Sequence, residues 1–157
     1  MNQWVLVGHR GVGKSSLLKE LSHRYTSMKC QSLDQLIVDG ERSSIIDIFS
    51  KNGEAHFRAL EKQYFYMFLK NNMDSSFVLD LGAGFSCDLP ENIYKLWVRR
   101  LTSSAHNMFL DRPNLKGGLK MLEAQFLERE KSYASKADLV VELREGVDFF
   151  QKGEELL

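Results

Sequence analysis

Short apolar runs alternate with longer helical patterns along the chain. Apolar runs with strand character lie at residues 4–7, 76–81, 94–101 and 139–143, with a weaker run at 28–33. Helical patterns lie at residues 15–25, 44–50, 53–71, 118–135 and 147–157. Strands that alternate with helices are typical of a parallel sheet covered by helices on both faces. The pattern therefore predicts an α/β fold.

The first apolar run is followed directly by the segment GHRGVGKS, residues 8–15. Its spacing matches the phosphate-binding pattern G-x-x-x-x-G-K-[ST], called the P-loop. The glycines let backbone N–H groups curl around an anion, and the next helix directs its positive end toward the same phosphates. In this pattern Lys14 reaches the β- and γ-phosphates, and the Ser15 hydroxyl binds Mg²⁺. We expect ATP, with Mg²⁺, to be bound by Gly8, Gly11, Val12, Gly13, Lys14, Ser15 and Ser16.

Composition narrows the classes of partner. The 157 residues suffice for one domain with its own core. The 21 Lys and Arg residues balance 21 Asp and Glu residues, and no basic run is interleaved with aromatic residues. We therefore expect neither nucleic acid nor an acidic membrane as a partner. Because the chain shows no signal segment and no apolar run of membrane-spanning length, we expect a cytoplasmic protein, and we expect it to be a monomer.

Cysteines and histidines add no candidate metal site. Cys30 and Cys87 are too few for a disulfide framework and lack the spacing of metal ligands. The four histidines form no metal-ligand pair on a shared helix face, and we interpret them as structural or surface residues.

Three polar clusters follow the P-loop. Asp34, in SLDQLI, comes after the second predicted strand and should face the phosphate site, because ligands of open α/β sheets bind beyond the carboxyl ends of the strands. Its alternative role is that of a helix N-cap. Arg58 and Glu61, in GEAHFRALE, share a helix face and could form an ordinary exposed ion pair. The turn LGAG, residues 81–84, either lets backbone N–H groups approach a ligand or marks a plain turn.

Taken together, the order of these motifs resembles the shikimate kinase family along nearly the whole chain. The resemblance runs from the P-loop through SLDQLI, SIIDIFSKNGEAHFRALE, LGAG, DRPNL and EREKSYASKADLVV, and residues 40–61 are its most diagnostic part. It implies a nucleoside-monophosphate-kinase-like P-loop fold with three layers, in which a five-stranded parallel sheet has the order 2-3-1-4-5. It also implies a single kinase domain over residues 1–157 with a short lid around 111–118.

The resemblance further implies roles for individual residues. Asp34 would hold the accepting hydroxyl and take its proton, while Arg112 on the lid would swing toward ATP and the transferring phosphoryl group. Arg58 and Arg129 would grip the carboxylate of the acceptor. Two arginines that bind one carboxylate would orient the acceptor and reject uncharged polyols. The substrate pocket would be formed by Asp34, Arg58, Gly82, Ala83, Gly84 and Arg129.

Several positions depart from the family pattern. Ser32 stands where the family has the first aspartate of D-x-D, and Ala83 replaces the middle glycine of a G-G-G turn. If the turn needs a positive φ there, alanine costs about 1–2 kcal/mol. The lid motif reads Arg-Pro-Asn-Leu, and the segments before Tyr94 and before Arg112 are shortened.

We expect Asp80 to replace the acid that is missing at Ser32. Asp80 ends the apolar run 77–80, and four apolar positions that close on an aspartate are typical of a Walker B strand, whose acid holds Mg²⁺ directly or through water. We expect Asp80, with Ser15, to bind the metal. The alternative is that Asp80 caps or braces the glycine turn.

Three functions compete at this point. The first is an active kinase that moves the γ-phosphate of ATP onto a hydroxyl of shikimate or a similar small hydroxy acid. The second is a degenerate shikimate-kinase-like protein that binds nucleotide or ligand without turnover, as Ser32 and Ala83 suggest. The third is a related kinase with another acceptor, such as a gluconate-type or nucleoside kinase; the arginine pair instead predicts an acceptor with a carboxylate.

Overall fold

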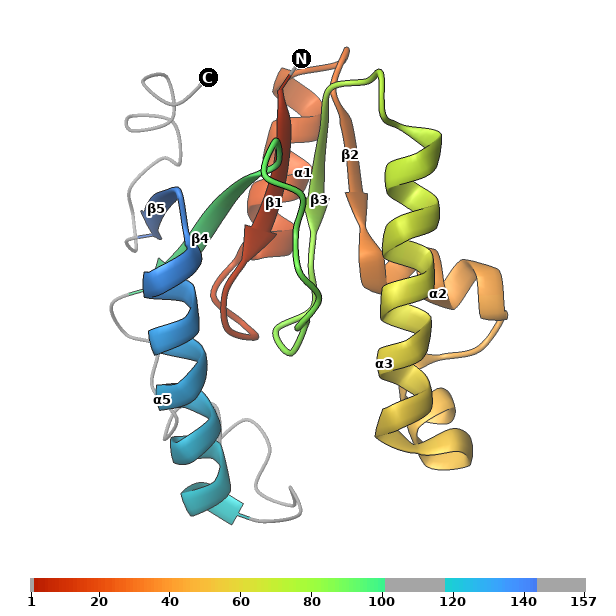
Figure 1. Ribbon diagram of the computed structural model, residues 1–157, viewed down its shortest axis with the longest axis vertical. Coiled ribbons are helices and arrows are strands. Elements are labelled where there is room, and N and C mark those ends of the chain that lie inside the picture. The colour runs from red at the N-terminus through yellow and green to blue at the C-terminus, as the bar shows by residue number, and fades with distance from the viewer. Residues whose placement is uncertain (1, 101–117, 144–157) are drawn as a thin grey trace.

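The computed structural model describes residues 2–100 and 118–143 of the chain (Figure 1). The strands are β1 Gln3–Val7, β2 Lys29–Ser32, β3 Phe77–Asp80, β4 Tyr94–Arg100 and β5 Leu139–Leu143. The helices are α1 Lys14–Arg24, α2 Leu33–Glu41, α3 Ile45–Asn71 and α5 Gly118–Lys136. Of the expected elements, the helix at 147–157 lies outside the described residues, as do residues 101–117, which hold Arg112 and nearly all of the expected lid.

All five strands run parallel in one sheet with the order β2-β3-β1-β4-β5. This confirms the α/β fold and the strand order that the family resemblance implied. The register pairs Asp80 with Leu6 on one side and with Ser32 on the other. The ends of β1, β2 and β3 therefore meet at one edge of the sheet, where ligands of open α/β sheets bind.

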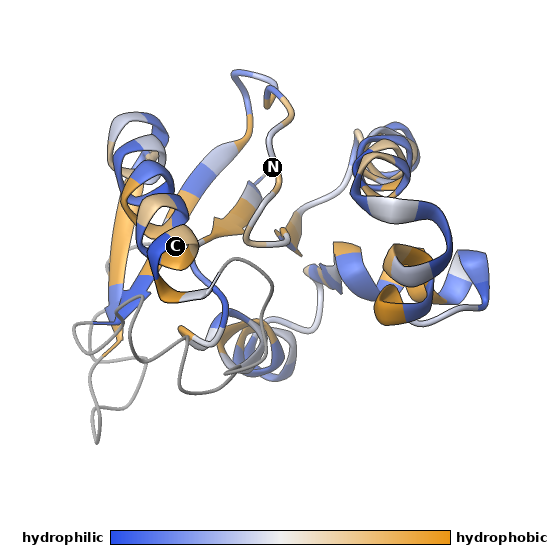
Figure 2. Ribbon diagram, turned by 90° about the horizontal axis from the view of Figure 1, so that it is seen from below, coloured by the Kyte–Doolittle hydropathy of each residue, from blue (hydrophilic) through white to orange (hydrophobic). Residues whose placement is uncertain are grey.

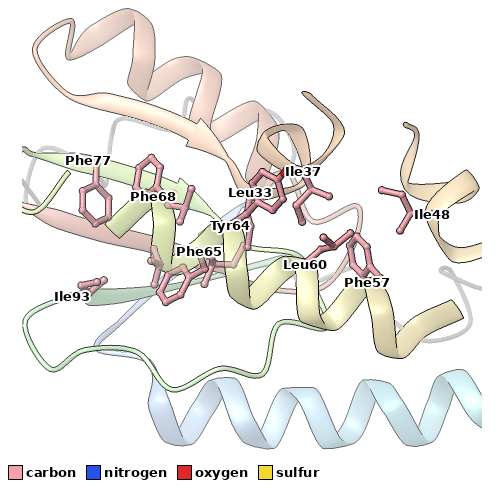
Figure 3. Close-up of a cluster of buried hydrophobic side chains, with 13 residues drawn as sticks. Leu33, Ile37, Ile48, Phe57, Leu60, Tyr64, Phe65, Phe68, Phe77 and Ile93 are labelled. Carbon is pink, nitrogen blue, oxygen red and sulfur yellow. The ribbon is translucent and has the colours of Figure 1, made fainter. Parts of the chain in front are cut away.

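Alternating side chains of the central strands fill two separate cores. On one face, Val5 and Leu79 pack with α2 and α3, whose buried residues include Leu33, Phe57 and Phe65 (Figure 3). On the other face, the neighbouring side chains of the same two strands pack against α1. Figure 2 shows the apolar residues concentrated on the strands and on the helix faces turned toward them. Each fully buried aliphatic or aromatic side chain contributes about 1.5–3 kcal/mol, so both faces hold the sheet firmly under the site.

Helix α2 is the element that the sequence pattern did not predict. The expected strand at 28–33 ends at Ser32, and its last residue, Leu33, begins the helix instead. The Ser32 hydroxyl oxygen accepts a hydrogen bond from the Gln35 N–H at 3.4 Å, which makes Ser32 the N-cap. Leu33 and Ile37 are both fully buried, and their spacing of four residues is a helical signal that continues beyond the predicted strand.

The two helices expected at 44–50 and 53–71 are continuous in α3 except at one residue. Gly53 has φ 79° and ψ 175°, a conformation that L side chains rarely adopt, and it kinks the helix there. Ser44 caps the start by accepting a hydrogen bond from the Asp47 N–H at 3.1 Å. Residues 81–93 join β3 to β4 without a helix or strand, in keeping with the shortened segment before Tyr94. None of the helices in the described ranges is both long and apolar enough to cross a membrane.

Candidate active site

The P-loop connects β1 to α1 and folds around the side chain of Lys14. The Lys14 Nζ donates hydrogen bonds to the carbonyl oxygens of Gly8 at 3.0 Å and His9 at 3.1 Å. Burial lowers the pKa of Lys14, while Asp80 and Asp34 act in the opposite direction. The loop thus holds an ammonium group next to two carboxylates at the end of the sheet.

The glycines of the loop suit an anion. A Cβ at Gly8 would collide with the carbonyl oxygen of Val98, so only glycine allows this close passage of the two backbones. Gly13, with φ 105°, stands at the N-cap of α1, and among the described residues no side chain caps the first amides of this helix. Uncapped N–H groups at a helix N-terminus are donors for phosphate oxygens. The loop therefore fits a phosphate chain.

A cavity of about 710 Å³ opens in front of the loop, and we call it the P-loop cavity. Gly11, Gly13, Lys14, Ser15 and Ser16 line it from the loop side. Val12 is different, because its side chain is 1% exposed and packs in the core with α1. Of the predicted loop residues, Val12 can therefore meet a nucleotide only through its backbone.

Ser15 and Asp80 lie together in this cavity. The Ser15 hydroxyl donates to Asp80 Oδ2 at 3.3 Å, while Asp80 Oδ1 is buried and has no hydrogen-bond partner among the described residues. Burial raises the pKa of Asp80 to about 6. Mg²⁺ is usually bound by one or two carboxylates together with substrate phosphates, so this hydroxyl–carboxylate pair fits it. The side-chain hydrogen bond of Asp80 runs to α1 and not to the glycine turn, contrary to the bracing alternative.

Asp34 lies in the first turn of α2 and lines the same cavity. It does not cap this helix, because Ser32 does, and so the N-cap alternative for Asp34 is wrong. Burial raises the pKa of Asp34, and the cations Lys14, Arg10 and Arg58 oppose that shift. The carboxyl group thus faces the cavity and is surrounded by positive charge.

A second cavity, of about 550 Å³, adjoins the first, and we call it the arginine cavity. Arg58 and Arg129 line it from α3 and α5. Leu81 and Ala83 line both cavities, so the glycine turn is their common wall. The two predicted carboxylate-binding arginines therefore face the same space, next to the P-loop cavity.

Two glutamates hold Arg58 in place. Its guanidinium donates to Glu61 Oε2 at 2.6 Å and to Glu54 Oε1 at 3.1 Å. The Glu61 side chain is 3% exposed, so this is not the exposed ion pair that the spacing alone allowed. Cβ atoms built at Gly84 and Gly82 would run into the Arg58 guanidinium and the Glu61 carboxylate. The glycine turn therefore packs on the arginine–glutamate pair.

Ala83 causes no backbone strain in the turn. Among the described non-glycine residues, Arg42 alone has a positive φ, so the conformation of Ala83 is open to any L residue. Its carbonyl oxygen accepts a hydrogen bond from the Tyr133 hydroxyl of α5 at 2.8 Å. The turn therefore tolerates alanine in place of the family's middle glycine.

Replacing Ala83 with glycine should consequently destabilise the protein slightly. Glycine gains conformational freedom in the unfolded chain without relieving strain in the folded one, so the free energy of unfolding should fall by about 0.4–1 kcal/mol. Urea denaturation of Ala83→Gly beside the unmodified protein measures this. A gain in stability would mean that alanine is strained at this position.

Sequence reasoning missed two side chains of the P-loop segment. Arg10 lines the P-loop cavity and lies close enough to Lys14 and Asp34 to influence both pKa values. His9 is 2% exposed and contacts α5. The pattern G-x-x-x-x-G-K-[ST] leaves both positions open, so the only available signal was the basic character of these two residues.

Comparisons of the sequence with known proteins identify the shikimate kinase family. A family model described as shikimate kinase matches residues 10–152. A shikimate kinase of Geobacter metallireducens is 36% identical over 142 residues, covering 83% of this chain and 76% of that protein. One from Persephonella marina is 31% identical and covers 100% of this chain and 98% of the relative.

Solved structures share the fold. The shikimate kinase from Acinetobacter baumannii in complex with shikimate superposes with a TM-score of 0.78 at 18% identity, covering 99% of this chain and 90% of that one. The shikimate kinase from Aquifex aeolicus gives 0.72 at 23% identity, covering 98% and 92%.

Proposed function

Since the chain belongs to the shikimate kinase family, whose members are phosphotransferases with an alcohol acceptor, we propose that it transfers the γ-phosphate of ATP to a ring hydroxyl of shikimate. The observation that carries this proposal is the shared wall of the two cavities. A phosphate-binding loop lines one cavity, two arginines line the other, and Leu81 and Ala83 border both. A phosphoryl group and a carboxylate-bearing acceptor could meet across such a wall.

The reaction is a direct transfer from ATP to the acceptor, and the protein does little covalent chemistry in it. The acceptor hydroxyl oxygen forms a bond to the γ-phosphorus, the bond from that phosphorus to the bridging oxygen of ADP breaks, and the hydroxyl proton leaves. In the proposal, Asp34 accepts this proton. Because burial raises the pKa of Asp34, it is a stronger base than an exposed aspartate while the neighbouring cations keep it available as a carboxylate.

Positive charge around the phosphates supplies the rest. Lys14 would stabilise charge on the β- and γ-phosphates from the loop, and Arg112 is proposed to do so from the lid. When bound, Mg²⁺ would neutralise charge on the same phosphates, and Ser15 and Asp80 are the residues that would hold it. Positively charged groups that are already in place around the phosphates account for most of the rate enhancement in enzymatic phosphoryl transfer.

The acceptor would be selected by its carboxylate. Arg58 and Arg129 present planar, permanently charged guanidinium groups to the arginine cavity, and such groups bind carboxylates in bidentate fashion. The glutamates on Arg58 fix its orientation before any ligand arrives. Gly82, Ala83 and Gly84 would bring the backbone close to the acceptor ring. That the protein is a monomer and cytoplasmic is also part of this proposal, and sedimentation analysis tests the oligomeric state.

The second candidate is a degenerate shikimate-kinase-like protein that binds nucleotide or ligand without turnover. The observation that favours it is Ser32, which lines the P-loop cavity and caps α2 but lacks the family's carboxylate. Against it stands the register, which places Asp80 directly beside Ser32 on the neighbouring strand. The negative charge is thus retained close to the position where it is missing.

The acceptor class is tested by ADP release from ATP and Mg²⁺ in the presence of shikimate, gluconate, a nucleoside or glycerol in turn. We expect fast ADP release only when shikimate is the acceptor. EDTA should abolish this release because it removes Mg²⁺. Fast release with a nucleoside or glycerol would contradict the carboxylate selection. If no acceptor gives ADP release while ATP still binds, the result would favour the degenerate protein without turnover.

Replacing Asp80 with asparagine should raise the Mg²⁺ requirement. Asparagine keeps the size and one acceptor oxygen but removes the charge, so the Mg²⁺ concentration at which ATP binding is half-maximal should rise by about 10–100-fold, the usual cost of altering a metal's supporting residues. Equilibrium dialysis of ATP against a series of Mg²⁺ concentrations measures this without turnover. Turnover should follow the same shift.

Two further variants complete this test. Ser32→Asp in the Asp80→Asn background should restore part of the Mg²⁺ affinity, because the two positions are register partners. Asp74→Asn, which alters an exposed aspartate, is the control and should change nothing. An unaltered Mg²⁺ dependence in Asp80→Asn would refute the relocation of the metal carboxylate.

A further inference from the structure

His9 belongs to the P-loop through its main chain and to the surroundings of helix α5 through its side chain. Its carbonyl oxygen accepts a hydrogen bond from Lys14 Nζ at 3.1 Å, so its backbone is part of the phosphate-binding loop. Its imidazole is almost completely buried and contacts α5. One residue therefore joins the loop to a helix more than a hundred positions later in the chain.

Three residues on one face of α5 surround the imidazole. The ring stacks on Phe126, with centroids 4.0 Å apart and planes at 7°, and meets Tyr133 edge-on at 5.4 Å. Its Nε2 lies 3.0 Å from Glu130 Oε1. Burial, with Arg129 and then Lys14, lowers the pKa of His9 to about 4. The ring is therefore neutral near pH 7, and its Nε2–H donates a hydrogen bond to a charged carboxylate.

Within residues 2–100 and 118–143, the other side-chain contacts of helix α5 with the rest of the fold centre on Tyr133. None of its described residues is fully buried. Tyr133 donates its hydroxyl to the Ala83 carbonyl oxygen and lies 6.0 Å from the Trp97 ring. The stacked and hydrogen-bonded imidazole is thus the contact through which the P-loop holds this helix face.

Arg129 stands on α5 next to Glu130, and it lines the arginine cavity. We propose that His9 is a positioning residue for the acceptor: by holding Phe126, Glu130 and Tyr133, it sets the place of Arg129 in that cavity. The inference rests on the proposed function, in which Arg129 binds the acceptor carboxylate. The loop that would hold the phosphates and the helix that would hold the acceptor are then linked by one side chain.

Steady-state kinetics with separate variation of shikimate and ATP tests this inference. His9→Ala and Glu130→Ala, which remove the contact from opposite ends, should each raise the KM for shikimate roughly tenfold, as expected for a lost hydrogen bond to a charged group. The KM for ATP should change less than twofold, because the P-loop backbone is kept. His9→Gln retains a donor and should recover part of the loss.

The double variant His9→Ala/Glu130→Ala should be no worse than His9→Ala alone, because His9→Ala already removes the hydrogen bond to Glu130 together with the ring contacts to Phe126 and Tyr133. Glu123→Gln, an exposed position on the same helix, is the control and should leave both KM values unchanged. Additive losses in the double variant, or equal rises in both KM values, would overturn the inference.

Hydrogen exchange gives a readout that does not depend on activity. In the ligand-free protein, the amides of residues 126–133 should exchange severalfold faster in His9→Ala than in the unmodified chain, while the amides of β1 and β3 should not change. Equal exchange in α5 would overturn the inference. If the unmodified protein fails to phosphorylate shikimate, the proposed function fails, and the exchange comparison still decides whether His9 holds α5.

Discussion

Replacing Lys14 with alanine is expected to lower the rate of phosphoryl transfer by a factor of about 10²–10³, the usual cost of removing one preorganised group that stabilises charge in a transition state. The structure adds a second reason. The Lys14 ammonium also donates to the carbonyl oxygens of Gly8 and His9, so its loss relaxes the loop that should hold the phosphates. Both effects act on the same step.

The measurement is single-turnover transfer from ATP to shikimate, with far-UV circular dichroism to show that the fold is retained. Lys14 is buried, but its bonds lie within the loop and not in either apolar core, so the secondary structure should persist. Lys19→Ala, an exposed change on the same helix, is the matched control. Near-normal transfer by Lys14→Ala would show that the loop does not act as a P-loop.

Replacing Arg129 with alanine should weaken shikimate binding by about 2–5 kcal/mol, the range for truncating one partner of a hydrogen-bonded charge pair. ATP binding measured without acceptor should barely change. Arg58→Ala should have the same effect on shikimate, but it should also cost stability, because Glu61 would remain buried without its partner. Leaving such a group unsatisfied costs about 1–3 kcal/mol.

The pair of variants separates binding from folding. Calorimetric titration with shikimate and with ATP gives the two affinities, and urea denaturation gives the free energy of unfolding. Arg129→Ala should lose acceptor affinity alone, whereas Arg58→Ala should lose both affinity and stability. An equal loss of affinity for both ligands would place these arginines in the nucleotide site or in a purely structural role.

Much of the fold was predictable because its signals are local. The apolar runs predicted the strands to within a few residues, and the P-loop spacing predicted the position of the loop between β1 and α1. Helix α2 was missed because Leu33 follows a strand directly, so its apolar side chain was read as the end of the strand. The cap at Ser32 explains the change of direction, but Asp34 offered an equally good cap in the sequence.

The environment of the site was less predictable, because it depends on contacts between distant segments. Arg58 and Glu61 are three residues apart in any helix, yet only the packing of the glycine turn shows that Glu61 is buried. The pairing of Ser32 with Asp80 required the strand register. The contact of His9 with α5 joins residues 121 positions apart and had no signal in the sequence.

Phosphorus NMR of a mixture of the protein, ATP, Mg²⁺ and shikimate tests the proposed transfer most directly. A phosphate monoester of shikimate should appear together with ADP in equal amounts, and neither should form with Lys14→Ala. ADP together with free inorganic phosphate and no monoester would contradict the transfer, as would unchanged ATP in a sample shown to bind both ligands.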